Sequence, residues 1–291
     1  HFAAQVAVTT SLDDPIHDFE VNARGTVNVL EAIRHSLRRP PLFFTSTNKV
    51  YGGLDDLSME EQEMRYAPRA PVAEHGVSEE RPLDFHSPYG CSKGTADQYV
   101  RDYARSYGLQ TVVFRMSCIY GPHQFGTEDQ GWVAHFLIRA LNRETVTIYG
   151  DGRQVRDILF VEDLVDAFMA ASKQIDQVGG EAFNIGGGVE NTVSLLELVA
   201  AIARLDGRAM RIAWSDWRTG DQKYYVSDTR KFREATGWAP RVGTAAGVRA
   251  LREWLIAAGV PALVQRAEEI AEKPATPVSV TRVGDRPAAL P

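Results

Sequence analysis

The sequence is poor in cysteine and has no long hydrophobic run. Its 291 residues include two cysteines, Cys91 and Cys118. No second cysteine pair accompanies them at the spacing of a zinc site, so we expect no metal and interpret both as reduced thiols of a cytoplasmic protein. No stretch approaches the roughly 18 apolar residues that a membrane helix needs, so we expect no membrane partner.

Basic residues are fewer than acidic ones. The 32 Lys and Arg residues face 38 Asp and Glu residues, which gives a formal net charge of −6. This balance argues against a nucleic-acid partner, although a small anionic ligand needs only a local basic patch. With 44% hydrophobic residues, the chain has the composition of an ordinary globular protein.

Helical and strand patterns alternate along the first half of the chain. Helices are expected at 14–33 and 87–107, each with a proline at its start. A short β-rich run follows each helix, at 41–47 and 111–116. This order of helix, strand, helix, strand predicts a parallel sheet.

The second half predicts a further mixture of helices and strands. Ser194 and Glu197 fit a capping box at the start of one helix. The other expected helices cover 130–141, 162–172 and 245–258, and the expected strands cover 146–149, 155–161, 182–185 and 210–214. The polar segment from Gly52 to Phe85 is too long for an ordinary connection, so we interpret it as functional or as an insertion.

Tyr89 and Lys93 are the strongest local signal for chemistry. Residues four apart share one face of a helix, so the phenol and the ammonium are expected side by side. A cation within about 4–6 Å lowers the pKa of a phenol, which would make Tyr89 a general acid and base near neutral pH. The alternative for this spacing alone is a core tyrosine beside a surface lysine.

Thr47 ends the expected strand at 41–47. Ligands of a parallel sheet bind at the carboxyl ends of its strands, where the Thr47 hydroxyl can meet the start of the helix that carries Tyr89. The alternative role of Thr47 is to cap the turn that follows it.

Together these segments resemble the extended short-chain dehydrogenase/reductases, and among them the NAD-dependent nucleotide-sugar epimerases. The resemblance runs from His1 to about Ala258. Its further motifs are His1-x-Ala3-Ala4, Asn22-x-x-Gly25-Thr26, Phe114-Arg115, Tyr120-Gly121-Pro122, Gln154-x-Arg156-Asp157, Val161-Glu162-Asp163 and Arg218-x-x-Asp221.

The resemblance implies an α/β fold with two domains. A Rossmann-type parallel sheet, truncated at its N-terminus, would be followed by a smaller C-terminal α/β substrate domain. Residues 1–122 would be the remainder of the NAD-binding domain, with part of 153–185 returning to it. Residues 123–272 would mainly bind substrate, and 273–291 would form a flexible tail. The resemblance also implies a homo-oligomer, either a dimer or a tetramer.

The resemblance assigns roles to individual residues. Thr47, Tyr89 and Lys93 would be catalytic. The cofactor NAD would be bound by Ala3, Ala4, Gln5, Asn22, Tyr89, Lys93, Met116 and Cys118. The nucleotide-diphosphate sugar would be bound by Thr47, Asn48, Gln130, Gln154, Arg156, Arg218 and Asp221.

Two of these assignments have structural alternatives. A guanidinium can fork onto two phosphate oxygens, which suits Arg156 and Arg218 to a diphosphate. Both could instead form ion pairs within the protein. Gln130 lies in Asp129-Gln130-Gly131-Trp132, which could instead be a helix start with a packed tryptophan.

The two residues after Thr47 bear on the reaction. Sugar 4,6-dehydratases of this family carry Asp-Glu there, whereas this chain has Asn48-Lys49, which cannot supply a carboxylic acid and a carboxylate base. We therefore expect an epimerase, an isomerase in which NAD takes a hydride from a sugar carbinol and returns it to the other face of the keto-sugar.

Three stretches resemble one subgroup of these epimerases. They are 46–52, 83–94 and 129–133, and the subgroup inverts C2 of a CDP-linked deoxyhexose, as in the conversion of CDP-paratose to CDP-tyvelose in polysaccharide biosynthesis. The alternatives are a UDP-sugar 4-epimerase and, in another class, a non-catalytic nucleotide-binding member of the family.

One motif of the family does not occur in this sequence. The glycine-rich turn that meets the cofactor pyrophosphate would lie before His1, and Gly186-Gly187-Gly188 is no substitute because its helix starts only after Ser194. We expect roughly 80 residues to precede His1 in the complete protein. The chain as written is therefore expected to bind NAD weakly or not at all and to be inactive by itself.

Overall fold

Three parallel strands form the centre of the first lobe in this computed structural model, which describes residues 1–260. Their order in the sheet is β1 (Leu42–Thr47), β4 (Thr111–Met116) and β8 (Ala182–Ile185). Thr47 lies opposite Met116, which in turn lies opposite Ile185. The carboxyl ends of all three strands therefore meet at one edge of the sheet.

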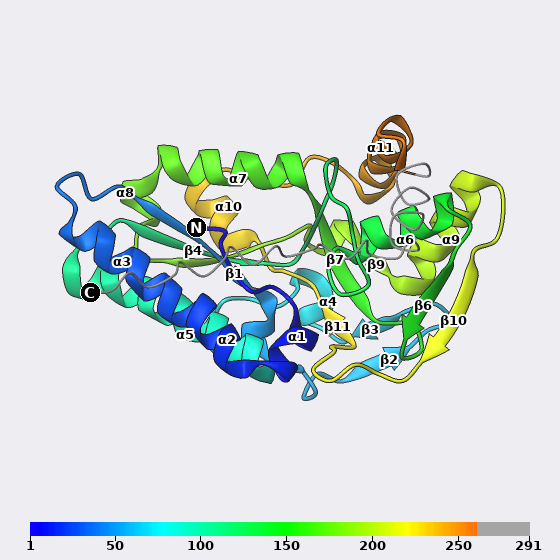
Figure 1. The fold of residues 1–291 in the computed structure, drawn as a ribbon, viewed down its shortest axis with the longest axis horizontal. Helices are drawn as coiled ribbons and strands as arrows, with labels where there is room; N and C mark the ends of the chain where they lie inside the picture. Colours follow the sequence, from blue (N-terminus) through cyan, green and yellow to red (C-terminus); the bar gives the residue numbers. More distant parts are fainter. Residues whose placement is uncertain (261–291) are drawn as a thin grey trace, which may run out of the picture.

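Helices cover both faces of this sheet (Figure 1). One face carries α3 (Gly25–His35) and α5 (Ser87–Tyr107), which pack on it through Leu30, Phe44 and Val100. The other carries α7 (Val161–Lys173), α8 (Ile175–Val178) and α10 (Arg230–Thr236), packed through Phe114 and Phe232. Helices α1 (Val8–Asp13) and α2 (Pro15–Phe19) and a π-helical segment, Glu20–Arg24, precede α3.

The second lobe is built around β7 (Val155–Phe160). Strands β5 (Cys118–Tyr120) and β11 (Tyr224–Tyr225) pair with β7 in parallel, and β9 (Thr192–Ser194) pairs with it antiparallel. A separate parallel pair joins β6 (Thr145–Tyr149) to β10 (Arg211–Ser215). Around them pack α6 (Trp132–Leu141), α9 (Leu195–Asp206) and α11 (Thr244–Ala257), with Leu137, Leu198 and Leu251 fully buried.

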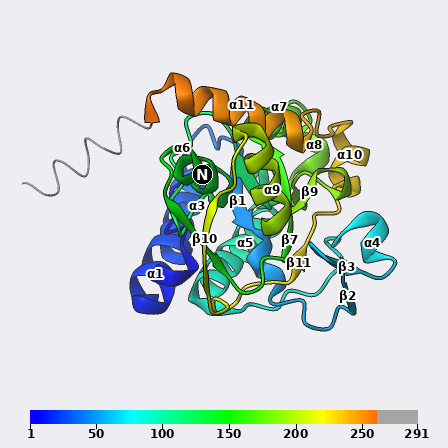
Figure 2. The same cartoon turned by 90° about the vertical axis from the view of Figure 1, so that its right-hand side faces the viewer.

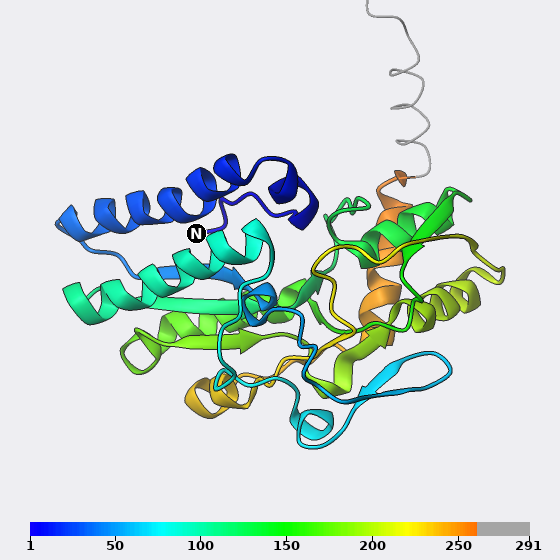
Figure 3. The same cartoon turned by 90° about the horizontal axis from the view of Figure 1, so that it is seen from below.

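The long polar segment contains short elements of its own. It forms a turn of 3-10 helix at Asn48–Tyr51, a hairpin of β2 (Met59–Glu61) and β3 (Tyr66–Pro68), and α4 (Val72–His75). The hairpin and α4 project from the body as one group (Figure 2). Seen from below, the hairpin lies along the second lobe (Figure 3), and the Tyr66 hydroxyl donates a hydrogen bond to Asp151 there at 2.6 Å.

The expected strands and most expected helices are confirmed, with shifts of a few residues at their ends. The capping box is confirmed: Ser194 Oγ accepts from Glu197 N at 3.0 Å, and Ser194 N donates to Glu197 Oε2 at 2.8 Å. The helix expected at 14–33 is confirmed as an uninterrupted helical run over 15–35, in which the segment Glu20–Arg24 is π-helical rather than α-helical. A short helix at Val189–Asn191 completes the described elements.

The division into domains at residues 122 and 272 stays a prediction. The buried cluster of the second lobe draws its residues from 118–260, whereas α7, β8 and α10 pack in the first lobe. The expected tail at 273–291 lies outside the described residues. Within residues 1–260, no helix combines the length and the apolar character that crossing a membrane requires.

Candidate active site

Thr47 and Tyr89 are brought together at the edge where the strands end. Thr47 is the last residue of β1, and its Oγ accepts a hydrogen bond from Lys49 N at 3.2 Å, which starts the 3-10 turn. Tyr89 lies in the first turn of α5, and both side chains are buried. The Thr47 hydroxyl is close enough to the phenol to act on its pKa. Thr47 thus both caps the turn and faces Tyr89.

The pKa of Tyr89 departs from expectation. Burial raises it to about 12; the Thr47 hydroxyl lowers it only in part, and the negative charge of Asp18 adds to the rise. The prediction that Lys93 lowers the pKa of this phenol to near neutral pH is therefore wrong for the protein without bound ligands. Desolvation of the phenolate is the larger effect in this buried position.

Lys93 shares the buried face of α5 with Tyr89 but donates elsewhere. Its Nζ donates to the carbonyl of Thr45 at 2.6 Å and lies 4.3 Å from the centroid of the Phe44 ring. Burial lowers the pKa of Lys93 to about 8, although Asp97 and Asp18 favour its charged form. The ammonium is thus held at β1 by a backbone carbonyl, one helical turn from the phenol.

Asn22 holds the N-terminal loop in place. Its Oδ1 accepts from Gln5 N at 2.9 Å, and its Nδ2 donates to Gln5 O at 3.0 Å. Asn22 also bonds Asp18 and Ser92, so the loop that includes Ala3 and Ala4 is tied to α5. Asn22 therefore positions this loop, and its direct contact with a cofactor stays a prediction.

The remaining predicted cofactor residues lie at strand ends. Met116 ends β4 beside Thr47, and Cys118 begins β5. Burial raises the pKa of the Cys118 thiol, although a hydrogen bond from Trp132 opposes it. Cys118 is thus a neutral thiol near the site.

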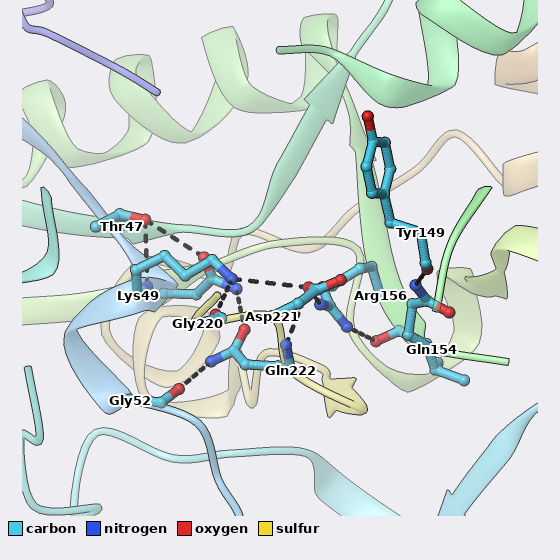
Figure 4. Close-up of polar contacts among 11 residues, drawn as sticks. Thr47, Lys49, Gly52, Tyr149, Gln154, Arg156, Gly220, Asp221 and Gln222 are labelled. Atoms are coloured by element: carbon cyan, nitrogen blue, oxygen red, sulfur yellow. Dashed lines mark hydrogen bonds and ion pairs between the residues drawn. The ribbon is translucent and has the colours of Figure 1, made fainter. Parts of the chain in front are cut away.

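Four predicted substrate residues lie between Thr47 and Tyr149: Asn48 follows Thr47 in the chain, and Asp221, Arg156 and Gln154 lead from there to Tyr149 (Figure 4). Arg156 Nη2 donates to Asp221 Oδ1 at 2.6 Å, and Asn48 Nδ2 donates to Gln222 Oε1 at 3.3 Å. Gln154 Nε2 donates to the carbonyl of Tyr149 at 2.7 Å. This cluster joins residues of both lobes.

Arg218 and Gln130 lie at the outer side of the site. The Arg218 guanidinium stacks 3.9 Å from the centroid of the Tyr149 ring and donates to the carbonyl of Glu128 at 3.1 Å. Gln130 donates to the carbonyl of Val6, and α6 begins only at Trp132. Arg218 and Arg156 are thus both engaged with acceptors within the protein, as the ion-pair alternative anticipated. Their contact with a diphosphate stays a prediction.

Sequence reasoning missed three residues of this site. Lys49 Nζ donates to the carbonyl of Gly220 at 3.0 Å, and Gln222 Nε2 donates to the carbonyl of Gly52 at 2.6 Å. Asp18 accepts from Asn22 and Ser92 although it is fully buried. Lys49 could have been found, because a cation stands where dehydratases carry an acid; the other two gave no local signal.

The class follows from the fold and the site. Parallel strands flanked by helices, with polar side chains at their carboxyl ends, define a Rossmann-type α/β protein. Comparison with known families makes this specific: residues 1–186 match the model of the NAD dependent epimerase/dehydratase family. The chain belongs to that family.

Individual relatives agree with this assignment. The chain is 44% identical over 259 residues to a CDP-paratose 2-epimerase of Salmonella typhi, covering 87% of this chain and 76% of that one. It is 35% identical to a UDP-glucose 4-epimerase of Mycolicibacterium smegmatis, covering 85% and 72%. The solved UDP-glucose 4-epimerase of Thermus thermophilus, in complex with NAD, is 32% identical with a TM-score of 0.73, covering 89% and 77%.

Proposed function

We propose that this protein is an NAD-dependent epimerase that inverts C2 of a CDP-linked deoxyhexose through a transient keto-sugar. The observation that carries the proposal is the buried Thr47–Tyr89 pair, followed by Asn48-Lys49 in place of a carboxylic acid pair. The 44% identity to a CDP-paratose 2-epimerase supports the choice of sugar nucleotide and of carbon.

The residues present fit NAD. The Lys93 ammonium has three N–H groups, and Thr45 O accepts one of them, which leaves donors for ribose hydroxyls. Gln5 Oε1 is buried without a hydrogen-bond partner among the described residues, so it can accept from an amide. Bound NAD would take a hydride from the sugar carbinol and return it. Tyr89, Lys93 and the loop held by Asn22 are the groups of this chain that would hold it.

Tyr89 would move the proton of the reaction. Its phenolate would take the proton of the sugar hydroxyl as the hydride leaves, and the phenol so formed would return that proton in the reverse step. An ammonium near the phenol favours the phenolate. Lys93, one helical turn away, is the ammonium that would do so when both reactants are bound. Thr47 would position the hydroxyl through its own hydrogen bond.

We also propose that the protein works in the cytoplasm as a homo-oligomer. Ile16, Phe19 and Tyr99 are exposed on α2 and α5, with 72%, 49% and 45% of their surface accessible. Large apolar side chains exposed on helices that pack against each other are typical of a protein interface.

The test is turnover of defined substrates by the full-length protein. CDP-, UDP-, GDP- and dTDP-sugars would be incubated with it, and the configuration at C2 and C4 read by NMR. We expect inversion at C2 of a CDP-linked deoxyhexose. Inversion at C4 of a UDP-sugar would establish the 4-epimerase instead, which the M. smegmatis relative favours. Bound NAD without any turnover would establish a non-catalytic protein.

A further inference from the structure

Asp221 lies close to two cationic side chains, those of Arg156 and Lys49. Its Oδ1 accepts from Arg156 Nη2 at 2.6 Å and from Gln222 N at 3.0 Å, and Lys49 Nζ lies 3.9 Å from the same oxygen. The side chains of Arg156, Asp221 and Lys49 are 9%, 21% and 22% exposed. Burial acts to raise the pKa of Asp221, but Arg156 and Lys49 together hold it below its ordinary value. Asp221 is therefore a carboxylate, and the cluster carries one surplus positive charge.

An incoming diphosphate would compete with Asp221 for Arg156. A guanidinium that forks onto two phosphate oxygens shares its single charge between the phosphate and the carboxylate, so Asp221 loses part of its compensation. Breaking a buried ion pair by removing one partner is strongly unfavourable, because the other charge is left without compensation. Binding through Arg156 thus requires a second cation for Asp221.

Lys49 is placed to be that cation. Its Nζ is already held beside Asp221 by the carbonyl of Gly220 at 3.0 Å (Figure 4). The loop that carries Asp221 is fixed to the turn after β1 by Gln222, which donates to Gly52 O at 2.6 Å and accepts from Asn48 at 3.3 Å. The exchange therefore needs only a small shift of side chains.

We propose that Lys49 is a positioning residue that takes over Asp221 as counter-ion, so that Arg156 is released to the substrate diphosphate. The inference rests on the proposed function, because that function supplies the diphosphate. It gives Lys49 a role at the position where the dehydratases carry the glutamate of their Asp-Glu pair.

The test is nucleoside diphosphate binding to the full-length protein. Titration calorimetry with CDP would compare the wild type with Lys49→Met, Lys49→Arg and, as a matched surface control, Lys173→Met. We expect Lys49→Met to weaken CDP binding about tenfold or more, the size of a lost charge-assisted contact. Lys49→Arg keeps the charge and should stay near the wild type, as should Lys173→Met.

A second substitution separates counter-ion from scaffold. Removing the charge of Asp221 removes the competitor for Arg156, so Lys49→Met combined with Asp221→Asn should recover most of the lost affinity. If Lys49 had only a structural role, Asp221→Asn would not restore the CDP affinity that Lys49→Met loses. Unchanged CDP affinity in Lys49→Met, or a double variant as weak as Lys49→Met alone, would overturn the proposal.

The pH dependence of CDP binding gives an independent reading. Burial, with Arg156, lowers the pKa of Lys49 to about 8, while Asp221 and, more weakly, Cys118 favour its charge. Affinity in the wild type should fall as the pH rises from about 7 to about 9, since a bound diphosphate favours the ammonium. Lys49→Arg should lack this fall, and a fall identical to that of the wild type would count against the proposal.

These outcomes are distinct from failure of the proposed function. Epimerisation of a CDP-sugar together with normal CDP binding by Lys49→Met leaves the function standing and removes the inference. The converse pattern, rescue of CDP binding by Asp221→Asn without turnover of any sugar nucleotide, removes the function and leaves the exchange standing. A wild type that binds no CDP contradicts the inference itself.

Discussion

At the scale of single residues, the chemistry depends on a phenol that burial has made a weaker acid. The pKa of Tyr89 is about 12, because the low dielectric around it disfavours the phenolate. The ammonium of Lys93, whose pKa burial lowers to about 8, is anchored to Thr45 O. Activation of Tyr89 therefore depends on how this ammonium and the Thr47 hydroxyl are arranged when both reactants are bound.

Replacing Tyr89 by phenylalanine removes the proton carrier and little else. We expect kcat of Tyr89→Phe to fall by about 10²–10⁴-fold, the usual contribution of a positioned acid and base, with NAD content unchanged. Tyr99→Phe, on the exposed side of the same helix, is the matched control and should keep wild-type kcat. Steady-state kinetics on the full-length protein measure both, and a kcat of Tyr89→Phe within threefold of the wild type would remove Tyr89 from the mechanism.

Residue spacing and the family pattern identified these residues from the sequence. The sequence could not predict their burial or their pKa values. The four-residue spacing of Tyr89 and Lys93 places both on one helical face, as predicted. How deeply the phenol is buried depends on the packing of β1 and α5, which no local pattern contains. For the same reason the ion pair of Arg156 with Asp221, 65 positions apart, is visible only in the structure.

At the scale of secondary-structure elements, Asp97 ties the catalytic helix to the sheet. Its Oδ2 accepts from Ser46 Oγ and from Arg115 Nε, both at 2.9 Å, and its Oδ1 accepts from Arg115 Nη2 at 3.0 Å. The side chains of Arg115 and Asp97 are 3% and 0% exposed. Helix α5 is thus locked to β1 and β4 by one carboxylate, one turn beyond Lys93.

Neutralising that carboxylate should destabilise the protein strongly. Asp97→Asn leaves the buried guanidinium of Arg115 without its counter-ion, and we expect a loss of about 3–5 kcal/mol in the free energy of unfolding. Asp102→Asn, exposed on the same helix, should change it by less than about 0.5 kcal/mol. Urea unfolding measures both, and equal stability of the two variants would show that this contact does not hold α5 in place.

Local signals decided which elements the sequence could predict. The capping box at Ser194 was predictable because both partners lie within three residues of each other. Strand β5 was not, because Cys118–Tyr120 has three residues and is defined by its pairing with β7. The hairpin at β2 and β3 was missed for a similar reason, since Met59–Glu61 is polar and largely exposed.

At the scale of the whole molecule, the candidate site lies where the two lobes meet. Asn48 reaches Gln222 across 174 positions of sequence, and Lys49 reaches Gly220 across 171. On the far side, Gln130 is bonded to Val6, 124 positions away. The first lobe supplies Thr47, Tyr89 and Lys93, and the second supplies Arg156, so a sugar nucleotide bound between them would touch both.

The order of helices and strands predicted the parallel sheet. The family motifs predicted that NAD and a nucleotide-diphosphate sugar bind at its edge. The contacts between the lobes were beyond prediction, because side chains such as Gln222 contribute to them only after both lobes have folded. The contacts of Asp221 with Arg156 and Lys49 were therefore visible only once the turn after β1 and the loop at 218–222 could be seen together.

The most direct test of the central claim, hydride removal and return at one carbon, follows an isotope at that carbon. A CDP-linked deoxyhexose with deuterium at C2 would be converted by the full-length protein in ordinary water, and the product examined by NMR and mass spectrometry. The account predicts that the deuterium remains at C2 of the inverted sugar, because the hydride that leaves is the one that returns. Replacement of the deuterium by hydrogen from the solvent would contradict it.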